Sequence, residues 1–108
     1  MVGCPLFRNK RIIEQPTDLT QLTTKYTENA KKFILKNTKR QKPFFLYLAY
    51  HQTHHPQFSS HEYDATFARG RFGMALSEMD NSFGSIMKTI NHLGIDNNTI
   101  IIFTSDNG

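Results

Sequence analysis

Apolar residues recur at spacings of three and four in two stretches of the chain, and this periodicity predicts two amphipathic helices. The first helix, capped by Thr17 or Asp18, is expected to end near residues 37–41. The second is expected over about residues 73–93, with Gly94 in the position of a left-handed C-terminal cap. The apolar faces consist of Leu19, Leu22, Tyr26, Ala30, Phe33 and Ile34 in the first helix, and of Leu76, Met79, Phe83, Ile86, Ile90 and Leu93 in the second.

Two continuous apolar runs, at residues 44–50 and 99–104, are strand-sized and rich in aromatic or β-branched side chains. Such runs favour strands that are buried on both faces, as in a parallel sheet. Residues 51–70 show no period and are rich in His, Ser, Pro and Gly, so we expect a long loop there. Residues 1–16 are expected to form an irregular lead-in with at most a short extended piece.

The predicted order is helix, strand, loop, helix, strand, which is an α/β arrangement. Two parallel strands joined through a helix form a right-handed crossover unit. Two strands alone leave unpaired sheet edges and an uncovered face. We therefore expect residues 17–108 to be part of a larger α/β domain, with the other strands supplied from outside this chain.

The composition suits a single folded domain, because 38% of the 108 residues are hydrophobic and 12% are aromatic. The one cysteine, Cys4, excludes an internal disulfide and a Cys-rich zinc site. No apolar run approaches the roughly 18 to 20 residues of a membrane-spanning helix. The first residues lack the pattern of a signal peptide, so we expect none in this chain.

The net charge of +4 is unevenly distributed along the chain. Residues 1–43 hold ten Lys and Arg against three Asp and Glu, whereas residues 44–108 hold three against six. The cations crowd the end of the first predicted helix, where they complement the helix dipole and stay solvated. No aromatic residues interleave with them as on a nucleic-acid stacking surface, so we expect no nucleic-acid partner.

Polar clusters follow both predicted strands. Three histidines, His51, His54 and His55, come after the first strand, and Asp106 and Asn107 come after the second. Because ligands bind beyond the carboxyl ends of parallel strands, both clusters are expected on one rim of the sheet. The histidines suit proton transfer or zinc binding, but local hydrogen bonding is the more common reason for three histidines in a loop. The two oxygen ligands suit calcium or magnesium but also a simple turn, and calcium needs about six to eight ligands.

The combination of these runs resembles the sulfatase family, in the branch of the arylsulfatases and N-acetylgalactosamine-6-sulfatases. One element is the apolar strand with the Thr-His-His-Pro run at 53–56. Others are the Arg-Gly-Arg-Phe-Gly and Glu-Met-Asp runs, and the last is the second strand with its Asp-Asn-Gly end. Their order and spacing match that family. In the sequence they occupy residues 42–50, 53–58, 69–73, 78–80 and 99–108.

The resemblance implies a partial alkaline-phosphatase-like α/β fold and hydrolysis of an aryl or sugar sulfate ester. It implies calcium (Ca2+) as cofactor and a formylglycine, made from Cys or Ser, as nucleophile. In the Thr-His-x-Pro motif of the family, the His contacts the sulfate and helps the leaving oxygen depart, which makes His54 the catalytic candidate. The Asp-Asn pair of the family ligates calcium, which makes Asp106 and Asn107 the metal candidates. The rest of a sulfatase catalytic domain is the implied partner that completes the sheet.

The chain departs from the family pattern in several places. The nucleophile of the family lies in Cys/Ser-x-Pro-x-Arg, whereas Cys4 is followed directly by Pro5 and lies too close to the first helix. Cys4 is therefore not assigned as the nucleophile. The early acidic metal ligands and the Lys-x-His pair are not found, and Met74 stands where relatives commonly carry Asp. We therefore expect residues 1–108, as one fragment of a sulfatase catalytic domain, to be inactive alone.

Two other interpretations stay open. One is a catalytically inactive, truncated sulfatase paralogue that acts, if at all, as a binding or interaction module. The other is a two-zinc hydrolase of the same fold, although no Asp-x-x-x-His pair occurs in residues 44–108. A full-length family member would be lysosomal or in the secretory pathway, where the Asn97-Asn98-Thr99 sequon could carry a glycan.

Overall fold

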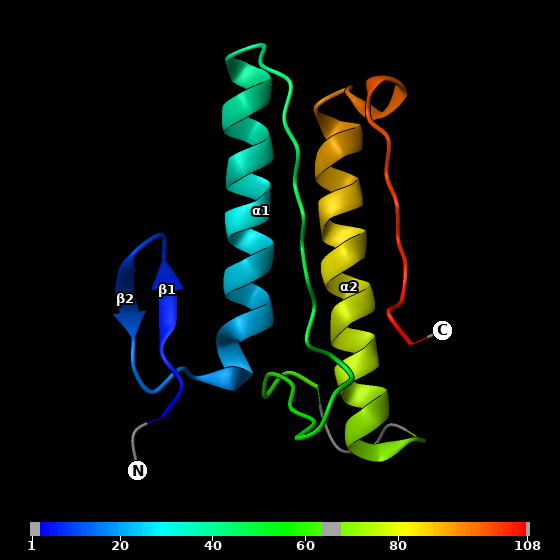
Figure 1. Ribbon diagram of the computed structural model, residues 1–108. Coiled ribbons are helices and arrows are strands. Elements are labelled where there is room, and N and C mark those ends of the chain that lie inside the picture. The colour runs from blue at the N-terminus through cyan, green and yellow to red at the C-terminus, as the bar shows by residue number, and fades with distance from the viewer. Residues whose placement is uncertain (1–2, 64–67, 108) are drawn as a thin grey trace.

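The computed structural model describes residues 3–63 and 68–107. Residues 1–2, 64–67 and 108 lie outside the described part of the chain. They belong to the start of the predicted lead-in, to the predicted loop and to the end of the Asp-Asn-Gly run, respectively. Two long helices, α1 (Leu22–Lys39) and α2 (Gly70–His92), dominate the fold, and Figure 1 shows them side by side. A small antiparallel hairpin precedes α1.

Both predicted helices are confirmed, and their ends are set by local chemistry. A 3-10 turn, η1 (Leu19–Gln21), leads into α1, and the Asp18 carboxylate caps it by accepting from the Thr20 N–H at 3.0 Å. Helix α2 begins at Gly70, three residues earlier than predicted. It ends before Gly94, whose φ of 63° is the left-handed conformation that glycine adopts at low cost.

The expected irregular lead-in is instead a hairpin of β1 (Leu6–Arg8) and β2 (Arg11–Glu14). Arg8 pairs with Arg11 across the turn, and Asn9 there has a φ of 57°, which Asn tolerates better than most residues. The hairpin is tied to α1 by an ion pair between Glu14 and Lys25. Cross-strand pairing, which periodicity over so few residues does not reveal, is the reason for the difference.

The two predicted strands are extended but carry no ladder hydrogen bonds in the described residues, so parallel strand pairing is not confirmed. We call residues 43–50 the inner segment and residues 99–107 the outer segment. In Figure 1 the inner segment (green) runs between α1 and α2, and the outer segment (orange to red) runs along the other side of α2. Both run in the same direction, opposite to the helices, and α2 separates them in this view.

The hydrophobic core lies between α1 and α2 in their C-terminal halves. Its buried centre is Ala30 and Ile34 from α1 with Ile86 and Ile90 from α2. Partly buried side chains pack against this centre, and they are Phe44, Leu46, Leu48, Leu93 and Ile95. The inner segment therefore contributes every second side chain to the core, as an extended chain does.

The inner segment is not buried on both faces, contrary to the sequence prediction. Phe45 and Tyr47, which alternate with the core-facing residues, are 87% and 79% exposed. Burial of that face would require a further layer, and no described residues cover it. The inward face alone is packed because the two helices supply apolar partners on that side only.

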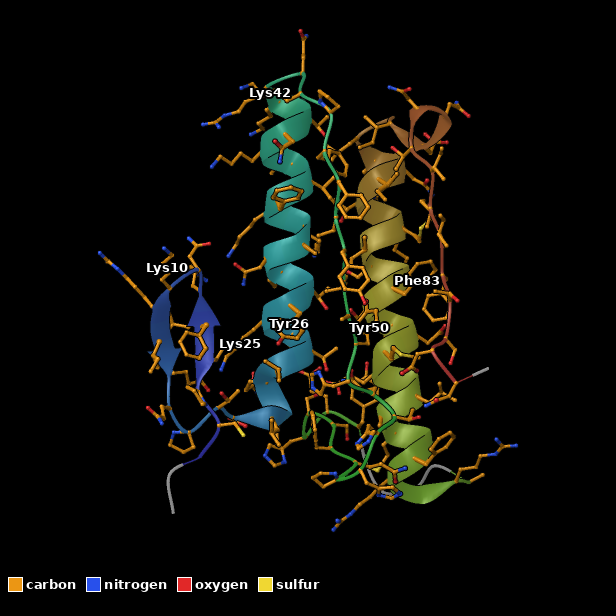
Figure 2. All side chains as sticks on the ribbon, viewed as in Figure 1. Lys10, Lys25, Tyr26, Lys42, Tyr50 and Phe83 are labelled. Carbon is orange, nitrogen blue, oxygen red and sulfur yellow. The ribbon has the colours of Figure 1, made fainter. Side chains whose placement is uncertain are left out.

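The buried face of α2 also differs from the predicted one in its first half. The buried residues of this helix are Ala75, Glu78, Ser82, Ile86 and Ile90. Leu76, Met79 and Phe83 instead line an open groove on the side of the outer segment. Figure 2 shows Phe83 pointing to that side, whereas Tyr50 lies between the two helices. Helix α2 thus has neighbours on two sides, and its apolar positions are divided between them.

Candidate functional site

The predicted catalytic residue His54 lies in the loop that follows the inner segment. We call residues 51–63 the site loop. A turn within the loop forms where the His54 N–H donates to the His51 carbonyl oxygen at 3.1 Å. The His54 side chain is exposed, and its Nδ1 lies 2.6 Å from the carbonyl oxygen of His55. A carbonyl only accepts, so Nδ1 carries the hydrogen and Nε2 is the nitrogen left to exchange a proton.

His51 occupies a different environment from His54. Its ring packs edge-on against Tyr26 of α1, with centroids 5.9 Å apart, and lies tilted against Phe58 at 4.9 Å. Burial lowers the pKa of His51, because a charged imidazolium is disfavoured among apolar rings. Its Nε2 is buried and has no hydrogen-bond partner in the described part of the chain. His51 thus packs at the base of the loop, whereas the His54 side chain is exposed.

A buried carboxylate, Glu78 of α2, contacts the site loop at two positions on either side of His54. Its side chain accepts from the Ser60 N–H at 3.2 Å and from the Gln52 amide at 3.4 Å. Glu78 is only 5% exposed, and this burial raises its pKa, while hydrogen bonds from Ser60, Gln52 and Thr23 oppose the shift. Gln52 also donates to the hydroxyl of Thr23 on α1.

Hydroxyl groups continue this polar interface between the helices. The Thr27 hydroxyl on α1 bonds both the Thr23 carbonyl and the Ser82 hydroxyl on α2. The Tyr50 hydroxyl lies 2.8 Å from Ser82, and burial raises the pKa of Tyr50 while this hydrogen bond lowers it. We call this set the polar cluster, and its members are Thr23, Thr27, Tyr50, Gln52, Ser60, Glu78 and Ser82.

A small cavity of about 160 Å³ lies against the polar cluster. Its walls come from α1, from the end of the site loop and from α2, and they are mainly hydroxyl, amide and carboxylate groups. Besides cluster members, the lining residues are Thr24, Glu28, Glu62, Tyr63, Asn81 and Ser85. The site loop and both helices thus meet at these polar contacts.

The predicted metal ligands lie elsewhere. Asp106 and Asn107 are exposed at the end of the outer segment, where the Asn107 N–H donates to the Ser105 hydroxyl at 3.3 Å. Helix α2 separates this end from the site loop in Figure 1, and no described contact joins His54 to either residue. The predicted shared rim is therefore not seen.

Asp106 and Asn107 offer hard oxygen atoms, the kind of ligand that calcium prefers. In number they supply only part of the six to eight ligands that calcium takes. Within residues 3–63 and 68–107, no group of three or more His, Cys, Asp and Glu side chains could hold a metal ion. The pair therefore fits calcium as a partial ligand set.

The model of the sulfatase family matches residues 6–108, and the chain therefore belongs to the sulfatase family. Membership implies an alkaline-phosphatase-like α/β fold. No helix in the described residues is both long enough and apolar enough to cross a membrane.

The sequence is similar to those of several individual sulfatases. The chain is 45% identical over 96 residues to N-acetylgalactosamine-6-sulfatase of Mus musculus, covering 89% of this chain and 18% of the relative. It is 39% identical over 108 residues to arylsulfatase A of Homo sapiens, covering 100% of this chain and 21% of the relative. It is 39% identical over 107 residues to steryl-sulfatase of Homo sapiens, covering 99% and 18%. The chain thus spans about a fifth of the length of these relatives.

Sequence reasoning missed the polar cluster. The polar residues Thr23 and Thr27 on α1, and Glu78 and Ser82 on α2, recur four positions apart, as the apolar residues of a helical face do. This spacing puts each pair on one helical face. A polar stripe in line with the apolar core positions was therefore the available signal.

Proposed function

We propose that this chain belongs to the catalytic domain of an enzyme that hydrolyses sulfate esters, with aryl or sugar sulfates as the substrate class. The observation that carries the proposal is the sulfatase match over residues 6–108, which includes the site loop and the end of the outer segment. The family resemblance also supports a lysosomal or secretory location. The formylglycine nucleophile that the resemblance implies is assigned to no residue of this chain.

In this proposal His54 contacts the sulfate and gives a proton to the departing ester oxygen. An exposed imidazole at a loop tip is accessible to a bound ligand, and His is the side chain that exchanges protons most readily near neutral pH. The contact of Nδ1 with the His55 carbonyl supports a fixed ring orientation, with Nε2 as the atom that transfers the proton.

Asp106 and Asn107 are proposed as two oxygen ligands of a calcium ion. A calcium ion held there would neutralise charge on the sulfate oxygens. The Ser105 hydroxyl, which accepts from the Asn107 N–H, holds the backbone of this turn. Both side chains are exposed and so are available to a ligand.

The test is the leaving-group dependence of His54→Ala in the full-length sulfatase that contains this segment. With an alkyl sulfate, whose leaving oxygen needs a proton, kcat should fall by about 10²- to 10⁴-fold, the usual contribution of a general acid. With 4-nitrophenyl sulfate the loss should be much smaller, because nitrophenolate departs without protonation. Steady-state kinetics with both substrates measures the difference.

His61→Ala is the matched control, because His61 is another exposed histidine of the site loop. It should leave both rates unchanged. Equal losses for the two substrates in His54→Ala would contradict the proton-donating role. A wild-type protein that binds sulfate esters but hydrolyses none would favour the alternative of an inactive binding module.

A further inference from the structure

One buried carboxylate connects three parts of the molecule. The Glu78 side chain on α2 accepts from the Gln52 amide at the start of the site loop, and from the Ser60 N–H nearer its end. Gln52 donates in turn to Thr23 on α1. Seven residues, 53–59, lie between these two anchors, and His54 is one of them.

The hydrogen bonds of His54 are local to the loop, whereas the anchors are not. His54 bonds the carbonyl oxygens of His51 and His55, which set the turn and the ring orientation. These contacts do not place the turn relative to the helices. The contacts of Glu78 do, because they join both ends of the turn region to α2.

The hydrogen bonds from Gln52 and Ser60 require a carboxylate at position 78. Burying a charged group carries a large desolvation cost, which hydrogen bonds to that group offset. An apolar side chain would avoid that cost but would leave the buried Ser60 N–H and the Gln52 amide without this acceptor. Ser60 is itself only 8% exposed, so water has little access to replace the lost partner.

We infer that Glu78 is a positioning residue for His54, acting by anchoring Gln52 and Ser60, which flank His54 in the site loop, to α2. The inference rests on the proposed function, since it assumes that His54 takes part in the reaction. Glu78 itself touches no substrate. Misplacement of a reacting group by about 1 Å can cost about 100-fold in rate, so the anchor has a measurable effect on catalysis.

The first test is Glu78→Gln in the full-length sulfatase. The glutamine keeps the size and one acceptor oxygen, but it removes the negative charge and the second acceptor oxygen that the Gln52 amide contacts. We expect kcat to fall by about 10- to 100-fold with KM little changed. Peptides covering residues 52–60 should exchange amide hydrogens about tenfold faster. Asp80→Asn, an exposed carboxylate on the same helix, is the matched control and should change neither.

The second test is rescue by exchange of the two side chains. In Gln52→Glu with Glu78→Gln, the carboxylate at position 52 can accept from the amide at position 78 and from the Thr23 hydroxyl. The amide oxygen at position 78 can still accept from the Ser60 N–H. The net charge is unchanged, so we expect the double variant to recover most of the lost kcat and the slow exchange of the loop.

The outcomes separate positioning from a merely structural role. A Glu78→Gln enzyme that melts earlier but keeps the wild-type kcat when folded would overturn the inference, as would a folded double variant without rescue. Should the single variant fail to fold, the double variant decides by itself. Full activity in His54→Ala would instead overturn the proposed role of His54, and the exchange of residues 52–60 would then report the anchoring separately.

Discussion

The inner and outer segments begin from similar sequence patterns and end in different environments. Both are continuous apolar runs and both are extended. The inner segment lies between two helices and places Phe44, Leu46 and Leu48 against the core. The outer segment lies against α2 alone, and its Ile100 and Ile102 are 91% and 81% exposed. An apolar run therefore specifies an extended chain, but its burial depends on how many elements surround it.

The contact between the outer segment and α2 is correspondingly loose. Its ring contact is between Phe83 and Phe103, with centroids 5.2 Å apart. An open groove of about 570 Å³ lies beside this contact, lined by Leu76, Met79 and neighbouring residues of α2. Close packing, which stabilises the inner side of α2, is not reached on this side.

The largest expected effect is a difference in stability between a substitution in the core and a substitution in the outer segment. Ile34→Ala in the core, where Ile34 is 1% exposed, should lower the free energy of unfolding by about 2–5 kcal/mol. Ile102→Ala in the outer segment should change it by less than about 0.5 kcal/mol. Urea denaturation of the 108-residue chain, followed by circular dichroism, measures both. Similar losses at the two positions would show that the outer segment is packed as tightly as the core.

A smaller effect is expected at the boundary where α2 leads to the outer segment. Gly94→Ala should destabilise the chain by about 1–2 kcal/mol, because φ at Gly94 is 63° and a Cβ atom is disfavoured there. Gly84→Ala, inside α2 with nothing within 4 Å of the new Cβ, should stabilise by about 0.5–1 kcal/mol. Thermal unfolding of the two variants should therefore shift in opposite directions. A neutral Gly94→Ala would mean that this end of α2 frays.

The smallest expected effect is a pH dependence of the free energy of unfolding, which arises from His51, directly after the end of the inner segment. Burial lowers the folded-state pKa of His51 below 6.5, so the unfolded chain binds the proton more readily. The contribution of His51 to stability is present above pH 6.5 and is lost as pH falls through the folded pKa. His51→Phe, which keeps a ring between Tyr26 and Phe58, should remove this loss.

The difference in unfolding free energy between His51→Phe and wild type should therefore grow as pH falls below 6.5. Glu78 has the opposite sign, because its raised pKa lowers stability as pH rises above 4.5. Comparing the two proteins at each pH cancels the contribution of Glu78. A difference that stays constant across this range would show that His51 titrates as in the unfolded chain.

The loop that carries His54 was predictable from the sequence, but the contacts that hold this loop were not. The Thr-His-His-Pro run made His54 a candidate through its resemblance to a family, and the structure places it exposed on a loop as the lack of periodicity indicated. The role of Glu78 was not predictable, because its two partners lie 18 and 26 positions away along the chain. The predicted meeting of His54 with Asp106 and Asn107 required strand pairing, which the described residues do not show.

Local interactions explain what the sequence determined by itself. Helix α1 with the Asp18-capped turn before it, helix α2 with Gly94 beyond its end, and the extended form of both apolar runs depend on residues within about four positions of one another. Tertiary structure alone decided which face of α2 is buried, which side of the inner segment is covered, and that a carboxylate could be buried at position 78. Burial and hydrogen bonding of these groups depend on partners distant in sequence, and their positions are known only once the chain has folded.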